Sequence, residues 1–329
     1  MGIGNANQGG EYERVLFAAL RALAVDRVTA EVISALRGCG IETILLKGPS
    51  IARWLYPAGG RVYTDTDILV PAGEISRAQK ALASLGFAYA FEGFNPIERG
   101  INPIEYQFIR QGMGWYMEVE KVDLHRNLPD LPVSDRALWE EFLAHSEIMR
   151  IGGVQVRVLA RPALALHIVL HALQHGFGFH TDEDLRRVIG EMPSDDWRPV
   201  VSLAARLGVE DALGVALRRH PDGETVADRL GLPLTSPRYC VSETLRIPAS
   251  LLALRAASDT SAKLRWLRWR VLPSPAKIRY VMQCPNAARH TVACGYVRWW
   301  WQLIPAALRL PWFLVNSRRT VRGTAGRPA

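Results

Sequence analysis

Two aspartates separated by one residue are the first feature of the sequence whose spacing suits chemistry. Asp65 and Asp67 lie in TDTDILV (64–70), where the alternation of side chains is typical of a β-strand. Strand geometry places both carboxylates on one face, with Cα atoms about 7 Å apart, where burial makes their repulsion costly. A hard divalent cation, Mg²⁺ or Mn²⁺, would remove that cost. On a solvent-exposed strand the same pair would only be hydrated, so this motif alone is weak evidence for a metal.

A glycine turn upstream of the aspartates carries groups that can bind phosphate. Gly48 stands between an apolar segment, residues 43–47, and a short helix, so backbone N–H groups can approach an anion at the helix start. Ser50 offers a hydroxyl and Lys47 a positive charge, although a lysine that ends a buried strand is more often structural. Arg61 could either neutralise a triphosphate or pair with a carboxylate when no metal is bound.

A third carboxylate comes from VDLH (122–125), where alternation puts Asp123 and His125 on the same strand face. Three carboxylates can hold two cations about 3.5–4 Å apart, an arrangement that stabilises both oxygens of an in-line displacement at phosphorus. We therefore expect Asp65, Asp67 and Asp123 to converge in the fold. His125 has two interpretations of equal weight, a residue of the site or a hydrogen-bonding anchor of the sheet.

These motifs resemble the largely uncharacterised bacterial nucleotidyltransferase family of the DNA polymerase β-like superfamily. The resemblance is carried by LLKGPSIARWLYPAGGRVYTDTDILV (45–70) and VDLHRNL (122–128), and it extends over residues 12–235. It implies an α+β fold, in which a polymerase β-like palm, a mixed sheet flanked by helices, is followed by a helical region. It also implies that the aspartates bind the metals and that Gly48 and Ser50 hold the triphosphate.

The activity that the resemblance implies is metal-dependent transfer of NMP from an NTP such as ATP to a hydroxyl or similar group. Asp123 would coordinate the metal nearest the attacking hydroxyl and could take its proton. The acceptor could be a small molecule, a peptide or protein, or a tRNA. The sequence departs from the superfamily at Pro49, which has no N–H to offer a phosphate.

The alternative is a non-catalytic accessory protein that binds a nucleotide or peptide and docks on a membrane or partner through its basic C-terminal region. Retention of all three carboxylates favours the enzyme.

Three histidines share one face of a predicted helix, because His167, His171 and His175 follow one another at intervals of four residues. The favoured interpretation is buried or interface histidines that hydrogen-bond the acids at 182–184. Lining of the acceptor site and metal binding are the alternatives, and no HExxH glutamate supports the metal. The family resemblance marks His171, His175 and Asp184 as recurring residues.

The elements that must position these residues follow from apolar periodicity and from turn signals. Helical spacing predicts helices over residues 11–38, 50–56, 74–87 and 134–144. Alternation and glycine turns predict strands over residues 43–47, 64–70, 106–110 and 115–125, and a hairpin that turns at Gly152–Gly153. From Arg161 onward the pattern is helical. We expect three parts: a palm domain with an N-terminal helix in residues 1–160, a helical domain in 161–236, and a basic, Trp-rich helical region in 237–329.

The composition is that of a globular protein, with 49% hydrophobic and 22% charged residues. No apolar run reaches the roughly 18–20 residues of a membrane-spanning helix, and the N-terminus has no apolar signal segment. The four cysteines include no CxxC pair, so neither a disulfide framework nor a cysteine zinc site is expected. These features predict a cytoplasmic protein.

The C-terminal region differs from the rest of the chain in charge. Residues 246–329 hold fifteen Lys or Arg and one acid, a net charge of +14, whereas residues 1–245 carry −6. Six of the ten tryptophans also lie there, and KLRWLRWRVL (263–272) and YVRWWWQLIPAALRLPWFLV (296–315) resemble helices that lie on a membrane surface. This pattern favours peripheral contact with the anionic inner face of the membrane. Contact with nucleic acid and packing on the chain's own domain are the alternatives.

Overall fold

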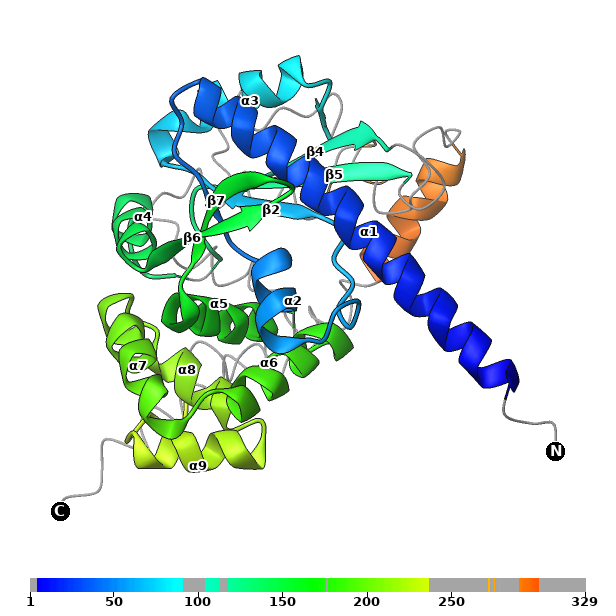
Figure 1. Cartoon of the computed structure of the whole chain (residues 1–329). Coiled ribbons are helices and arrows are strands. Elements are labelled where there is room, and N and C mark those ends of the chain that lie inside the picture. The colour runs from blue at the N-terminus through cyan, green and yellow to red at the C-terminus, as the bar shows by residue number, and fades with distance from the viewer. Residues whose placement is uncertain are drawn as a thin grey trace. The chain divides into compact units, whose positions relative to one another are not determined.

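A mixed seven-stranded sheet is the centre of the computed structural model (Figure 1), and its strand order is β3-β4-β5-β2-β1-β7-β6. β2 pairs with β5 in parallel, as β1 does with β7, and the other neighbouring strands are antiparallel. This order places β2 beside β5, although they are far apart in sequence. The strands are β1 (Ile44–Leu45), β2 (Thr66–Leu69), β3 (Ala88–Tyr89), β4 (Glu105–Gln111), β5 (Val119–His125), β6 (Ser146–Ile151) and β7 (Val154–Leu159).

The structure describes residues 5–90, 104–112, 118–129, 131–175 and 177–236, and then 272, 275, 278 and 290–301. Described residues up to Ser236 form one compact unit, and those from 272 onward belong to a second. Within these described ranges, no helix combines the length and the apolar character needed to cross a membrane. The loop expected after residue 90 and most of the two Trp-rich segments lie outside the described residues.

One face of the sheet is covered by α1 (Asn5–Gly38), which contacts β2, β6, β7 and α3 (Ile75–Ser84). The side chains beneath it form an apolar cluster, whose α1 members run from Ala24 to Leu36 and whose strand members include Ile68, Val122 and Leu124. Because side chains alternate along a strand, the residues between these apolar positions on β2 and β5 face the other side.

The remaining helices of the first unit include α5 (Arg161–Gln174), which contacts β7 as well as α6, α7 and α8. In Figure 1, α5 accordingly lies between the sheet and the other C-terminal helices. Most of its side chains are buried, and a proline stands in its first turn, where no N–H is needed. The others are α2 (Pro49–Leu55), α4 (Asp135–Ala144), α6 (Phe179–Glu191), α7 (Trp197–Arg206), α8 (Glu210–Leu217), α9 (Pro221–Arg229), and the 3₁₀ turns η1 (Ala72–Glu74) and η2 (Ser194–Asp196).

The α+β class, with a mixed sheet flanked by helices and followed by further helices, is confirmed. The hairpin between β6 and β7 turns at Gly152 and Gly153, which have φ values of 54° and 83°. Two of the predicted boundaries that differ bear on the site. The strand expected over residues 43–47 contains only β1, because Gly48 with φ 75° turns the chain into α2. The strand expected from residue 64 begins at Thr66, so Asp65 precedes it.

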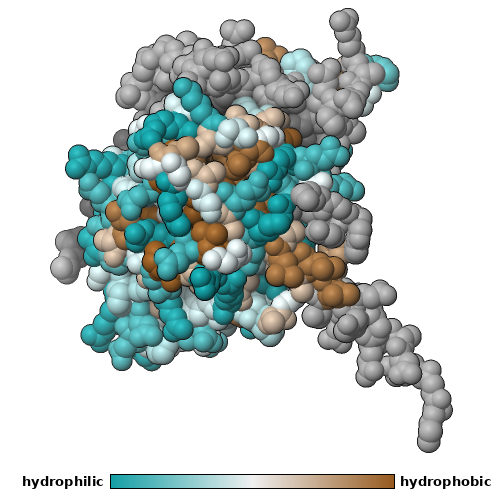
Figure 2. All heavy atoms as spheres, turned by 45° about the horizontal axis from the view of Figure 1, so that its top comes forward, coloured by the Kyte–Doolittle hydropathy of each residue, from teal (hydrophilic) through white to brown (hydrophobic). Residues whose placement is uncertain are grey.

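The surface of one face is hydrophilic with separate apolar patches, one of which lies at the visible N-terminal part of α1 (Figure 2). Leu16 and Leu23 are exposed in this part of α1. The cluster under α1 begins at Ala24. The helix therefore covers the sheet mainly with its C-terminal half.

Candidate active site

The three aspartates predicted to converge do so at the junction of β2 and β5. Asp67 on β2 stands opposite Asp123 on β5 in the parallel register, and Asp65 precedes β2 by one residue. One carboxylate oxygen from each lies within 4.8 Å of the others. The predicted convergence is therefore confirmed, and its cause is the parallel pairing of two strands that each carry an acid on the face away from α1.

Burial makes this cluster a candidate site for a cation. Asp67 is 2% exposed and Asp123 is 4% exposed. The Oδ2 atom of Asp67 is buried and has no hydrogen-bond partner among the described residues. Buried carboxylates without enough partners are costly, and three hard oxygens within 4.8 Å of one another are donors that suit a divalent metal.

Two lysines neutralise part of this charge. Lys121 places Nζ 2.8 Å from Oδ2 of Asp123 and 3.4 Å from Oδ2 of Asp65. Lys47 places Nζ 3.2 Å from Oδ1 of Asp67. Lys121 was not among the predicted site residues, although strand alternation puts it on the same face of β5 as Asp123.

The two buried carboxylates have opposite pKa shifts. Burial and the nearby Asp67 charge raise the pKa of Asp123 to about 6, against the opposing effect of Lys121. Burial alone would raise the pKa of Asp67, but Lys47 and His125 lower it below its ordinary value. Without a metal, the electrostatics therefore favour the ionised form of Asp67 more strongly than that of Asp123.

Histidines line the site from two elements. His125 on β5 lies with Nε2 3.3 Å from Oδ1 of Asp67, so it contacts the acid cluster directly. From α5, His171 lies with Nε2 3.3 Å from Nζ of Lys47. His167 is buried with both ring nitrogens unpaired within the described structure, and burial lowers its pKa to about 3. The ring of His175 lies 4.4 Å from that of His171.

Among the described residues, no hydrogen bond joins His167, His171 or His175 to the acids at 182–184, although such bonds were the favoured expectation. Asp184 instead accepts hydrogen bonds from Arg61 Nε at 2.8 Å, Arg61 Nη2 at 2.7 Å and the Tyr56 hydroxyl at 2.6 Å. The expectation is wrong for Asp184 because two stronger donors occupy both of its oxygens. Of the two interpretations of Arg61, the pair with a carboxylate is the one present, and its partner lies on α6 rather than in the aspartate cluster.

The glycine turn lies where the sequence placed it. Gly48 precedes α2 with φ 75° and ψ −111°, a conformation that other residues rarely adopt. Ser50 is 1% exposed, and its hydroxyl has no hydrogen-bond partner among the described residues. The turn thus holds an unsatisfied hydroxyl three residues from Lys47, whose ammonium already lies at the acid cluster.

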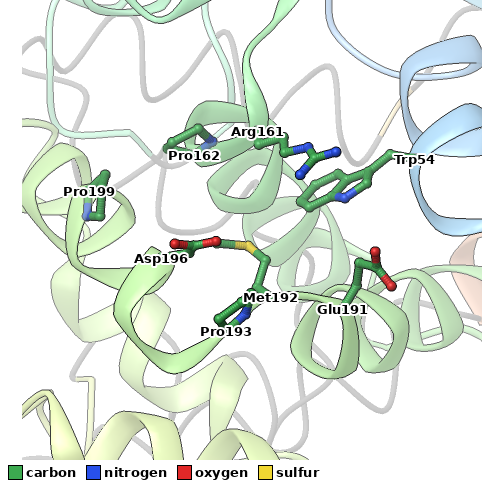
Figure 3. A pocket seen from close by; sticks show the side chains of 8 residues that line it. All are labelled: Trp54, Arg161, Pro162, Glu191, Met192, Pro193, Asp196 and Pro199. Carbon is green, nitrogen blue, oxygen red and sulfur yellow. The ribbon is translucent and has the colours of Figure 1, made fainter.

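A separate cavity of about 230 Å³ lies between α2 and the helices α5, α6 and α7 (Figure 3). In it, the Arg161 guanidinium stands over the Trp54 ring, 5.8 Å from its centroid. No site residue predicted from the sequence is among those that line it, which are Trp54, Arg161, Pro162, Glu191, Met192, Pro193, Asp196 and Pro199.

Comparison with known proteins identifies the family. No curated protein matches the sequence. The crystal structure of an antigenic nucleotidyltransferase-like protein from Paracoccidioides brasiliensis is similar over 66% of this chain and 96% of that one, at 12% identity and a TM-score of 0.38. A sequence model described as "Uncharacterised nucleotidyltransferase" matches residues 13–220, a span that includes every residue of the acid cluster. The chain therefore belongs to this family of uncharacterised nucleotidyltransferases.

Proposed function

We propose that the protein is a metal-dependent nucleotidyltransferase that moves NMP from an NTP to a hydroxyl or similar group of an acceptor. The observation that carries the proposal is the cluster of three carboxylates within 4.8 Å, one of them with an unpaired buried oxygen, in a member of a nucleotidyltransferase family. Two divalent cations, Mg²⁺ or Mn²⁺, would stabilise the charge on the attacking and leaving oxygens.

The chain's own residues have separate roles in this proposal. Asp65 and Asp67 hold the metals, and Asp123 holds the one nearest the acceptor. From that position the Asp123 carboxylate would also be placed to accept the proton of the attacking hydroxyl. His125 contacts Asp67 at 3.3 Å and so fixes the orientation of that carboxylate.

The triphosphate would lie over the glycine turn. Gly48 supplies a backbone conformation that opens the start of α2, and Ser50 supplies a hydroxyl that now has no described partner. Lys47 and Lys121 now pair with the carboxylates. If divalent cations balanced the carboxylate charges, both ammonium groups could turn to phosphate oxygens, which they would bind as point charges.

The two lysines also favour a second candidate, the non-catalytic accessory protein. A cluster whose charge is already balanced by Lys47 and Lys121 could bind a nucleotide or peptide without metal. Titration with Mn²⁺ separates the two candidates. An enzyme would bind Mn²⁺, and Asp67→Asn would abolish that binding. An accessory protein would not bind Mn²⁺.

The direct test of the transferase is incubation with each α-labelled NTP, Mg²⁺ and cell lysate, followed by identification of the labelled acceptor. Label transfer that requires Mg²⁺ and is lost in Asp67→Asn supports the proposal. Absence of transfer from all four NTPs, together with absence of Mn²⁺ binding, would overturn it. The acceptor classes, a small molecule, a peptide or protein, or a tRNA, separate by size in the same experiment.

For the C-terminal region we propose peripheral contact with an anionic membrane surface. The support is its net charge of +14 and the helical residues 290–301, where Val297 and Trp301 are exposed, the latter by 73%. Tryptophan and basic side chains together give reversible attachment to anionic lipid. Sedimentation of the protein with anionic vesicles at low salt, and its release at high salt, tests the contact.

A further inference from the structure

The segment that carries Asp65 is held by side-chain hydrogen bonds at two positions. It runs from the end of α2 to the start of β2, through residues 57–65. Near its end, the Tyr63 hydroxyl donates a hydrogen bond of 2.8 Å to Asp26 on α1. Earlier, Arg61 reaches in the other direction, to Asp184 on α6. One metal ligand of the proposed site is therefore held between α1 and α6, which lie far apart in the sequence.

The anchor at Arg61 has the geometry of a strong, specific interaction. Its guanidinium binds both oxygens of Asp184 at 2.8 and 2.7 Å, and the two side chains are 13% and 3% exposed. The Tyr56 hydroxyl donates to the same carboxylate at 2.6 Å. Arg187 in turn stands over the Tyr56 ring, 4.2 Å from its centroid, and donates to the carbonyl of Leu55. A bidentate, buried arginine pair fixes direction as well as distance.

This anchor is also electrostatically connected to the acid cluster. Burial alone would lower the pKa of Arg61, but Asp184 raises it above its ordinary value, and Asp65 contributes in the same direction. The guanidinium thus lies within the field of Asp65 while its hydrogen bonds go to Asp184. Loss of Asp184 would free Arg61 to move toward the acid cluster and would leave the Tyr63–Asp26 hydrogen bond as the remaining contact of the two that hold the segment.

We propose that Asp184 and Tyr56 are positioning residues for the metal site, which hold Arg61 so that residues 57–65 present Asp65 to Asp67 and Asp123. This inference rests on the proposed function, because it concerns the same metal site. It assigns Arg61 to the architecture of the site and not to the triphosphate. It also makes α6 part of the catalytic unit.

Mn²⁺ binding by the full-length protein, measured calorimetrically well below the melting temperature, tests the inference. Asp184→Asn and Arg61→Gln should each weaken Mn²⁺ binding about tenfold, as loss of residues that orient metal ligands does. Tyr56→Phe removes one hydrogen bond and keeps the ion pair, so it should fold readily and weaken binding by a smaller factor.

A matched control is Glu120→Gln. Glu120 is 1% exposed and accepts a 2.7 Å hydrogen bond from Arg110, so it belongs to a comparable buried pair, but it lies on the face of β5 away from Asp123. This variant should lower the melting temperature without changing Mn²⁺ affinity. Equal loss of affinity in Glu120→Gln and Asp184→Asn would reduce the effect to general destabilisation and overturn the inference.

The double variant Arg61→Gln with Asp184→Asn separates positioning from direct phosphate binding. If the two residues act as one unit, the double variant binds Mn²⁺ and NTP no more weakly than the worse single variant. A much larger loss of NTP affinity in Arg61→Gln than in Asp184→Asn would place Arg61 on the triphosphate and overturn the inference. Absence of Mn²⁺ binding by the wild type would overturn the proposed function and this inference with it. Binding that Asp184→Asn leaves unchanged overturns the inference alone.

Discussion

Replacing Asp67 by asparagine tests the proposed metal binding and the stability of the fold together, because this carboxylate would contribute to both. Its Oδ1 atom lies 3.2 Å from Lys47 Nζ, and the two side chains are 3% and 18% exposed. Unit charges at this distance attract by about 5 kcal/mol at an effective dielectric constant of about 20. Removing one partner of a buried pair typically costs about 3–5 kcal/mol, since the other charge stays buried.

We expect Asp67→Asn to lie at the low end of that range, at about 3 kcal/mol. Lys47 keeps the fields of Asp65 and Asp123, both of which act to raise its pKa. For a unit of this size, a loss of about 3 kcal/mol lowers the melting temperature by about 6–12 °C. The variant should therefore fold at room temperature, melt earlier in EDTA and show no rise in melting temperature with Mn²⁺.

Thermal unfolding with and without Mn²⁺ measures both effects in one assay. A saturating ligand at about 100 times its Kd stabilises the wild type by about 2.7 kcal/mol, which is a resolvable shift. Asp65→Asn is the matched control. Asp65 is 21% exposed and contacts Lys121 at 3.4 Å, so its loss should abolish the Mn²⁺ shift at a cost below about 1 kcal/mol.

The double variant Asp67→Asn with Lys47→Met tests whether the unpaired Lys47 charge causes the loss of stability. Methionine fills the space of the lysine stem without a buried charge, so the double variant should recover most of the stability and none of the metal binding. Full NTP turnover by Asp67→Asn, where a loss of more than about a hundredfold is expected, would refute the role of Asp67. If Asp67→Asn had the melting temperature of the wild type in EDTA, the ion pair with Lys47 would not contribute to stability as we expect.

Three further predictions concern other parts of the chain. His167→Leu should not destabilise the protein at pH 7, because both ring nitrogens lack described partners. Since its pKa is lowered to about 3, the wild type should lose about 1–2 kcal/mol more stability than His167→Leu between pH 6.5 and 5, measured by denaturant unfolding. Gly48→Ala should cost about 1–3 kcal/mol, because φ is 75°, and should weaken NTP binding. Truncation near Pro237 should abolish salt-sensitive binding to anionic vesicles, whereas aggregation of the truncated protein would favour packing of the region on its own domain.

Local sequence patterns predicted the faces of the strands but not their partners. Alternation put Asp65 and Asp67 together on one face of their strand, and it put Asp123 and His125 together on one face of theirs. The parallel register that sets Asp67 opposite Asp123 is a contact over 56 residues, which no local period encodes. Convergence of the three aspartates was expected from their chemistry, because three carboxylates can hold two cations, and the family resemblance implied the same site.

Side-chain partners were the least predictable feature. Lys121 could have been found, because it shares the strand face of Asp123. The pair of Arg61 with Asp184 could not, since it joins residues 123 positions apart. The histidines of α5 were assigned to acids near them in sequence, but His171 lies against Lys47 because α5 packs on the sheet and brings this face to the end of β1.

The candidate site is built from both the sheet and the helices that follow it in sequence, because residues of the two contact each other there. Lys47 lies at the centre, with Asp67 on the sheet at 3.2 Å and His171 on α5 at 3.3 Å. Burial lowers the pKa of His171 to about 2, and Lys47 adds to that shift, so the imidazole is neutral and can accept from the ammonium. A neutral acceptor on one side and a carboxylate on the other leave the lysine with one hydrogen-bonding direction still to fill. Under the proposed function this third direction would face a phosphate oxygen, and α5 takes part in the site by supplying the His171 acceptor.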